Sequence, residues 1–542
     1  MATYYFRNVG TAWNDNTSWS TTSSTGASAG AIPTAADDVI FDSGSANSCP
    51  VSTTDGVCLT FNSTSWTGTL TLDTSVTVSG NVTLSSNTTI TGSSFFRINA
   101  TASITSNSVT IPYFVLGSGT AMTLTLSGDL NVGIFELGGS GVINYNLLGN
   151  NLNVTGDVQR NLSSQGFLSG TTVVNLIGTS NVFDCGTTGA GILWYLPLTI
   201  NTSGTVTFSD NFLFINNRLT HSAGTVNAFS TSFSFFGNVT ANCENILFNT
   251  VNLTMNNSFT PNVPTLTLLN NLNVGTLNLI HNFTGAITIN GLFTVFIGNR
   301  SGNIGSLIFL NTAGGSTVLG TSTLEFTGIG GVGYWTAGNG PFAASPRVDL
   351  NITINTSGTL YIIEKTLSST VRFFPNLAGG RTFRYTKGTV ITRNITSSNA
   401  GTPRYQGSQL SVATTHTLIG MNNIAWGRIV FAGSGTFTMN ELPQGSSTVI
   451  TNMISSTAAN YTITLTGNNR ERFYNFLKIQ RCTIAVASRR NTIVVTYREG
   501  NLGGNIGIIF GNSGANSTPK NLIPQSVYGI VGFLADPAIS SR

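Results

Sequence analysis

Carboxylates are the residues of this sequence that could carry out hydrolysis, and they are scarce: Asp and Glu number 19 in 542 residues. Cleavage of a glycosidic bond needs two carboxyl groups about 5–9 Å apart. Glu136 and Asp157 are the pair that could meet if successive turns of a repeating fold stack. Chance proximity explains such a pair more simply, so we expect no enzymatic activity and assign no catalytic residue. The isolated carboxylates of the middle of the chain are Asp129, Glu136, Asp157, Asp184, Asp210, Glu244, Glu325 and Asp349.

The densest acidic cluster is a candidate calcium site. Asp37, Asp38 and Asp42 lie together in TAADDVIFD, and carboxylates with backbone carbonyls can bind Ca²⁺. Alternation along an extended strand puts Asp38 and Asp42 on one face and Asp37 on the other, which favours a role in shaping the turn. The three histidines are far apart, and no Cys or His has the spacing of a zinc site. We therefore expect no metal and no cofactor.

Arginines interleaved with aromatic residues form the best candidate binding surface. Guanidinium groups and aromatic faces suit both sugars and anionic groups. In RTFRYTK (381–387) the two kinds alternate, so the other interpretation is a strand with aromatics in the core and arginines in solvent. The candidate binding residues are Arg372, Arg381, Arg384, Tyr385, Lys387, Arg393, Arg404 and Tyr405.

The formal net charge of +4 is unevenly distributed. Residues 1–359 hold 6 Lys/Arg and 14 Asp/Glu, whereas residues 360–542 hold 17 Lys/Arg and 5 Asp/Glu. A basic end could bind an anionic partner such as nucleic acid, an acidic glycan or an acidic protein. A solvated surface explains it equally well, and we do not expect nucleic acid to be the partner.

Composition argues against a disordered chain and against membrane helices. Only 8% of the residues are charged, against roughly 25% in an average soluble protein. The chain has 33 Phe and 13 Tyr, which disordered chains lack, and no apolar run approaches the ~20 residues of a membrane span. The start, MATYYFRNVG, shows no secretion signal, so we expect assembly in a cytoplasm without membrane insertion.

The five cysteines do not form a disulfide framework, because they are odd in number and scattered. Cys49 and Cys58 in CPVSTTDGVC could bridge a loop. The other interpretation is two reduced, partly buried thiols.

Strict alternation of apolar and polar residues predicts short β-strands throughout the chain. LTLDTSVTVSGNVTL (70–84) and YTITLTG (461–467) are examples. Turn residues end each strand. Gly followed by Asn or Asp recurs between strands, as in VSGNVTL (78–84) and VTGDVQR (154–160), and we expect these glycines to take positive φ in tight bends.

Longer repeats indicate a fold built from stacked units. TINTSGT occurs at 199–205 and again at 353–359, and TLTLSGDLNVG (123–133) returns as TLTLLNNLNVG (265–275). The heptapeptide holds no group suited to catalysis, so we interpret it as a structural repeat. In such a fold each unit buries its apolar face against its neighbours, and Thr, Asn and Ser at equivalent positions can form hydrogen-bonded ladders.

The predicted fold is all-β, a repetitive parallel β-helix (β-solenoid) with about 20–25 residues per turn; tandem β-sandwich domains are the alternative. We expect an N-terminal cap segment at 1–65, which the aromatic stretch YYFRNVGTAW would help to build, and a β-solenoid at 66–420. The solenoid contains two related blocks, at about 120–265 and 266–420. A basic C-terminal β region follows at 421–542.

WNDNTSWS (13–20), IPTAADDVIFDSGS (32–45) and the TINTSGT repeats resemble β-helical appendage proteins of bacteriophages, of the tail-spike, tail-fibre or head-fibre type. The resemblance implies a virion structural protein that forms a projecting fibre, spike or capsid decoration. It implies a homotrimer that contacts other virion proteins and attaches to a glycan or protein receptor on the host surface. The chain lacks an evident anchoring head domain and a recognisable autocleaving chaperone. The alternatives are a bacterial surface adhesin or filament subunit, and a glycan depolymerase on a β-helix scaffold.

Overall fold

The structure, a computed structural model, is an all-β fold, and its described residues contain no helix. The predicted parallel β-solenoid is confirmed. The chain divides into two compact units, Met1–Asn252 and Leu253–Arg542. The structure describes residues 1–117, 119–139, 144–162, 167–184, 193–209, 212–215, 217–227, 232–235, 238–243, 246–255, 265–281, 286–298, 304–310, 317–337, 347–363, 382–393, 409–412, 416–419, 428–431, 436–439, 442, 451–455, 458–465, 472–474, 477–486, 493–495 and 509–510.

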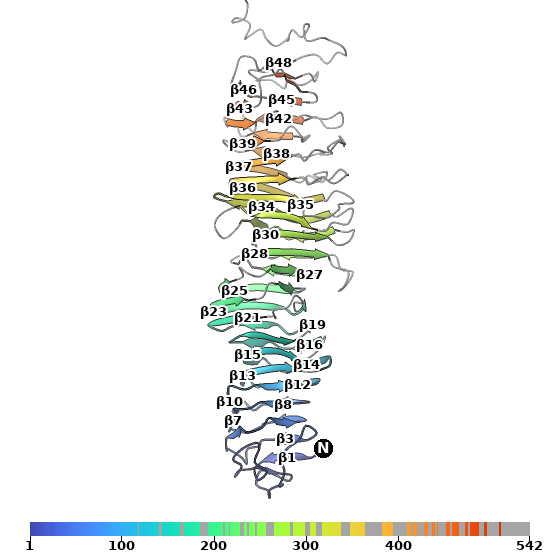
Figure 1. Ribbon diagram of the computed structural model, residues 1–542, viewed down its shortest axis with the longest axis vertical. Coiled ribbons are helices and arrows are strands. Elements are labelled where there is room, and N and C mark those ends of the chain that lie inside the picture. Colours follow the sequence, from blue (N-terminus) through green and yellow to red (C-terminus); the bar gives the residue numbers. More distant parts are fainter. Residues whose placement is uncertain are drawn as a thin grey trace, which may run out of the picture. The chain divides into compact units, whose positions relative to one another are not determined.

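The first unit is a parallel β-solenoid of about 11 turns, and each complete turn places one strand on each of three faces, called A, B and C (Figure 1). Face A carries β4 (Cys49–Val51), β7 (Thr69–Leu72), β10 (Thr89–Gly92), β17 (Leu152–Val154), β20 (Val174–Leu176) and β27 (Asn238–Asn242). Face B carries β5 (Gly56–Cys58), β8 (Val76–Val78), β11 (Phe96–Ile98), β18 (Val158–Leu162) and β21 (Ser180–Phe183).

Four strands bend from face A onto face B, and a third column completes each turn. The bent strands are β13 (Thr110–Gly117), β15 (Leu130–Gly139), β23 (Leu198–Phe208) and β25 (Arg218–Asn227). Face C carries β6 (Thr60–Asn62), β9 (Val82–Thr83), β12 (Ala102–Thr105), β14 (Met122–Leu126), β16 (Asn144–Gly149), β19 (Phe167–Gly170), β22 (Leu193–Trp194), β24 (Phe212–Ile215), β26 (Ser232–Phe235) and β28 (Leu247–Met255).

The length of a turn agrees with the prediction. On face C, Val39 pairs with Phe61, 22 residues further on. The spacing rises to 26 residues between Leu168 and Trp194 and falls to 20 between Ile215 and Phe235. Each turn therefore repeats the in–out alternation of the previous one, which keeps apolar residues inside.

An aromatic cluster occupies the N-terminal end of the first unit. β1 (Thr3–Phe6) pairs antiparallel with β2 (Trp19–Ser20) and parallel with β3 (Asp38–Ile40). Trp13 and Trp19 are fully buried with ring centroids 5.1 Å apart, and the Trp19 indole donates a hydrogen bond to the Trp13 carbonyl at 2.7 Å. These rings fill the end of the column, where no earlier turn exists to cover the core.

Like residues stack inside the solenoid from turn to turn. On face B, Phe96 pairs with Phe114, Phe114 with Phe135, and Phe183 with Phe208. All five side chains are at most 2% exposed. Stacked rings bury a large apolar area with favourable ring–ring geometry, so this column is a main source of stability.

A polar ladder runs along the outside of face A, as predicted. Asn153 donates from its side-chain amide to Asn131, and Asn175 donates in the same way to Asn153, each at 2.9 Å. The three residues are partners in the parallel register. The ladder satisfies polar groups between turns without charged residues, which explains how a chain with so few ions keeps a polar surface.

The repeated TINTSGT segment forms the same corner twice. In each copy a Thr hydroxyl accepts a hydrogen bond from the Gly amide two residues later, from Gly204 to Thr202 at 3.0 Å and from Gly358 to Thr356 at 2.9 Å. Both threonines are at most 2% exposed. A Cβ at Gly204 would lie 1.5 Å from the Thr179 carbonyl oxygen of the preceding turn. The segment therefore has a structural role.

The expectation of positive φ at the Gly-Asn and Gly-Asp bends is wrong for the described examples. Gly80, Gly128 and Gly156 are not among the residues with positive φ. Gly80 and Gly156 are needed for another reason, because a Cβ at either would lie 2.8 Å from a backbone carbonyl oxygen of the preceding turn. Close stacking of turns selects glycine at these two bends.

The second unit is also built from parallel strand pairs. One column runs through β34, β36 and β37, and the register continues to β38 and β40. Its strands are β29 (Thr265–Leu268), β30 (Leu272–His281), β31 (Ala286–Asn290), β32 (Thr294–Ile297), β33 (Ser306–Leu310), β34 (Thr317–Gly328), β35 (Val332–Ala337), β36 (Arg347–Ile363), β37 (Thr382–Arg393), β38 (Gln409–Val412), β39 (His416–Ile419), β40 (Arg428–Phe431), β41 (Thr436–Met439), β42 (Thr451–Ser455), β43 (Tyr461–Leu465), β44 (Arg472–Tyr474), β45 (Leu477–Ile479), β46 (Cys482–Val486), β47 (Ile493–Val495) and β48 (Ile509–Phe510).

The described cysteines, Cys49, Cys58, Cys243 and Cys482, are free and buried. Cys49 and Cys58 are therefore reduced thiols, and the alternative of a bridge between them is not realised. Burial raises the pKa of Cys243 to about 12, so its thiol stays protonated and unreactive at neutral pH.

Candidate functional site

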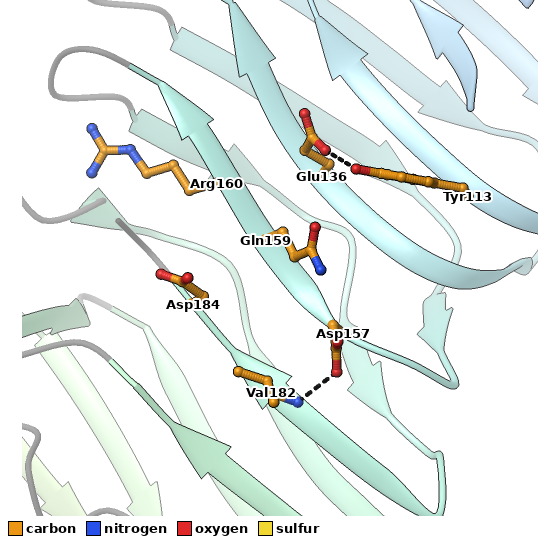
Figure 2. A pocket seen from close by; sticks show the side chains of 7 residues that line it. All are labelled: Tyr113, Glu136, Asp157, Gln159, Arg160, Val182 and Asp184. Carbon is orange, nitrogen blue, oxygen red and sulfur yellow. Dashed lines mark hydrogen bonds between the residues drawn. The ribbon is translucent and has the colours of Figure 1, made fainter. Parts of the chain in front are cut away.

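A cavity of about 420 Å³ lies on face B of the first unit (Figure 2). Its lining residues come from four consecutive turns, on or beside β13, β15, β18 and β21. They are Tyr113, Glu136, Asp157, Gln159, Arg160, Val182 and Asp184.

Strand register brings these side chains together. Glu136 pairs with Gln159 on the next turn, while its neighbour Phe135 points into the core and pairs with Val158. Because side chains alternate along a strand, burying Phe135 directs Glu136 outward. Asp157 immediately precedes β18 and Asp184 immediately follows β21, so the two aspartates flank the strands that form one wall.

Tyr113 and Glu136 form the most buried part of the site. The Tyr113 hydroxyl donates a hydrogen bond to Oε2 of Glu136, and Glu136 is only 8% exposed. Burial, followed by this hydrogen bond, raises the pKa of Tyr113 well above its usual range. Tyr113 is therefore a neutral hydroxyl at physiological pH, and it fixes the orientation of the carboxylate.

Asp157 connects two turns at the edge of the cavity. Its Oδ1 accepts a hydrogen bond from the backbone amide of Val182 at 2.7 Å (Figure 2). Val182 is 39% exposed and adds a small apolar surface beside the carboxylate. This tie holds Asp157 in place relative to the next turn.

Aromatic and cationic groups border the site on the side of Tyr113. The Phe95 ring lies edge-on to Tyr113 with centroids 6.0 Å apart, and the Arg97 guanidinium lies 4.3 Å from the centroid of the Phe95 ring. Such stacking gives Tyr113 a rigid support.

The arrangement suits recognition of a polar organic ligand. Carboxylate oxygens accept hydrogen bonds, the Gln159 amide both donates and accepts, and the Arg160 guanidinium donates. Within the described part of the chain, no group of three or more His, Cys, Asp or Glu residues is placed to hold a metal ion. The carboxylates are therefore distributed around the cavity and do not converge on one point.

The sequence analysis identified part of this site. It proposed that Glu136 and Asp157 could meet on adjacent turns, and both line the cavity. It did not identify Tyr113 or Gln159. A signal was present, because Tyr113, Glu136 and Gln159 are spaced by 23 residues, which is one turn.

The candidate basic surface falls mostly where the structure gives no side-chain positions. Arg384, Tyr385, Lys387 and Arg393 are in β37, where their backbone pairs with β36. The remaining candidates, Arg372, Arg381, Arg404 and Tyr405, lie outside the described residues. The surface therefore stays a prediction.

The N-terminal acidic cluster has separate structural partners. Asp37 accepts hydrogen bonds from the Thr34 hydroxyl at 2.6 Å and from the Ala2 amide at 2.7 Å. Asp38 accepts from the Thr60 hydroxyl at 2.6 Å, and Asp42 from the Gly44 amide at 2.9 Å. These contacts match the interpretation that the acids shape turns.

Comparison with family models, with curated proteins and with solved structures gives no match. The class of this chain is therefore defined by its fold alone, a parallel β-solenoid. In the residues that the structure describes, no helix is long and apolar enough to cross a membrane.

Proposed function

We propose that this chain is a structural protein of a bacteriophage particle, a projecting fibre, spike or capsid decoration that attaches the particle to the host surface. The observation that carries the proposal is the parallel β-solenoid with its uncharged outer ladder. A solenoid presents long, regular faces that suit binding to extended partners. The resemblance of WNDNTSWS and the TINTSGT repeats to phage appendage proteins supports the same role.

In this proposal the chain assembles in the host cytoplasm as a homotrimer and then binds other virion proteins. The receptor is a glycan or a protein exposed on the host. The outward residues of faces A and C, including the Asn131–Asn153–Asn175 ladder, are rich in groups that hydrogen-bond to hydroxyls.

Competition tests the attachment role. Purified chain added to host cells before infection should saturate receptors and lower phage adsorption in a dose-dependent manner, whereas heat-unfolded chain should not. Antibodies against the chain should label intact particles in electron micrographs. Unchanged adsorption at saturating protein, together with unlabelled particles, would contradict the proposal.

A second candidate function is glycan cleavage, favoured by one observation: Glu136, Asp157 and Asp184 line a single cavity. Incubation of the chain with host surface polysaccharide should then release reducing ends, and Glu136→Gln should abolish the release. No release from a polysaccharide that the chain binds would leave attachment as the function.

A further inference from the structure

We infer that the face B cavity binds a protonated amino group carried by an amino sugar of a surface polysaccharide. This inference rests on the proposed attachment function and names the ligand class of the site. It follows from the charge, the burial and the hydrogen-bonding capacity of the lining residues.

The cavity has an excess of negative charge. Three of its lining side chains are carboxylates and one is a guanidinium. The whole first unit holds 4 Lys/Arg against 12 Asp/Glu, so its long-range field also attracts cations. An anionic or fully neutral sugar would leave this excess uncompensated.

Glu136 is the residue that most requires a cationic partner. It is only 8% exposed, and burial of a carboxylate is costly unless it is paired and hydrogen-bonded. Among the described residues, its hydrogen bonding is limited to Tyr113, which uses Oε2. Oε1 is left with acceptor capacity on the cavity side (Figure 2).

Asp157 repeats this pattern one turn further along. The Val182 amide bonds to Oδ1, and Oδ2 is left with acceptor capacity. Two fixed carboxylates on adjacent turns thus offer oxygens to one ligand. An ammonium group matches them because it has three donors and no acceptor.

A sugar fits better than a bare metal ion. The described residues hold no group of three or more acidic, His or Cys side chains placed for a metal. The volume of about 420 Å³ lies within the ~300–1,000 Å³ range of small-molecule sites. Gln159 can donate to and accept from sugar hydroxyls, and Val182 offers an apolar contact for a ring face.

Calorimetric titration of the full chain with two probes tests the inference. The probes are a β-1,4-linked glucosamine tetramer with free amines and its fully N-acetylated counterpart. The free-amine tetramer should bind at least about tenfold more tightly, because charge-assisted hydrogen bonds are roughly twice as strong as neutral ones. Its affinity should fall as salt rises.

Substitutions assign the binding to the cavity. Glu136→Gln and Asp157→Asn should each weaken binding of the free-amine tetramer by about tenfold or more, with little change for the acetylated one. Asp129→Asn is the matched control. Asp129 also accepts a backbone amide from the next turn, that of Asn151 at 3.1 Å, but it lies outside the cavity and should leave affinity unchanged. Far-ultraviolet circular dichroism confirms that each variant is folded.

Equal affinity for the two tetramers, or no binding by a chain that still blocks phage adsorption, would overturn the inference and leave the attachment function standing. Loss of affinity in Asp129→Asn equal to that in Asp157→Asn would also overturn it. Selective tetramer binding by a chain that does not block adsorption would support the site and reject the attachment function.

Discussion

At the scale of single residues, close stacking of backbone decides which positions can change. Gly204 faces the Thr179 carbonyl oxygen so closely that no Cβ fits, whereas a Cβ at Gly128 would meet nothing within 4 Å. Both glycines lie near turns, and the sequence alone does not distinguish them. The difference comes from the preceding turn, which only the three-dimensional register reveals.

Gly204→Ala should destabilise the first unit by about 2 kcal/mol or more, because the backbone of the corner must shift to relieve the clash. Gly128→Ala should leave stability within about 0.5 kcal/mol. Urea denaturation curves of the two variants measure the difference. Equal midpoints for both variants would show that the corner does not pack as described.

At the scale of strands and ladders, the sequence predicted a large part of the fold. Alternation in segments such as 70–84 gave the strands, and the recurrence of TINTSGT gave the stacked turns. The positive φ expected at Gly80 and Gly156 was wrong because local turn preference ignores the neighbouring turn. The meeting of Tyr113 with Glu136 depends on strand register, and irregular turn lengths of 20 to 26 residues hide that register in the sequence.

The asparagine ladder should contribute measurably to stability. Asn153→Ala removes the hydrogen bonds to both Asn131 and Asn175, and each such bond is worth about 1 kcal/mol. We expect a loss of about 1–2 kcal/mol in the free energy of unfolding.

Asn87→Ala, at an exposed position, is the control and should change stability by less than about 0.5 kcal/mol. A loss in Asn153→Ala no larger than in this control would remove the ladder from the account.

The N-terminal end of the first unit should weaken in acid. Hydrogen bonds from the Thr17 hydroxyl and amide, then from Thr11, lower the pKa of Asp15 from 3.8 to about 2. Since the pKa is lowered in the folded chain, its stabilising effect is complete above about pH 4 and is lost as pH falls through about 2. Asp15→Asn should remove this part of the pH dependence.

Urea denaturation monitored by tryptophan fluorescence at pH 6, 4 and 2.5 measures it, since Trp13 and Trp19 are buried beside Asp15. Asp129→Asn controls for the loss of a carboxylate elsewhere. Identical acid sensitivity of Asp15→Asn and the unmodified chain would show that Asp15 has no such role.

At the scale of the molecule, the charge is divided between the two units. The first unit holds 4 Lys/Arg and 12 Asp/Glu, and the second holds 19 Lys/Arg and 7 Asp/Glu. This division predicts different partners: a cationic sugar for the first unit and an anionic surface for the second. Both expectations concern binding, as an attachment protein requires.

Electron cryomicroscopy of the purified chain tests the central claim most directly, because one map gives both strand stacking and subunit number. We predict a homotrimer in which residues 49–215 of each subunit form stacked parallel strands about 4.8 Å apart, with one turn every 20 to 26 residues. Antiparallel sandwiches in this region, or a monomer without stacked turns, would contradict the account.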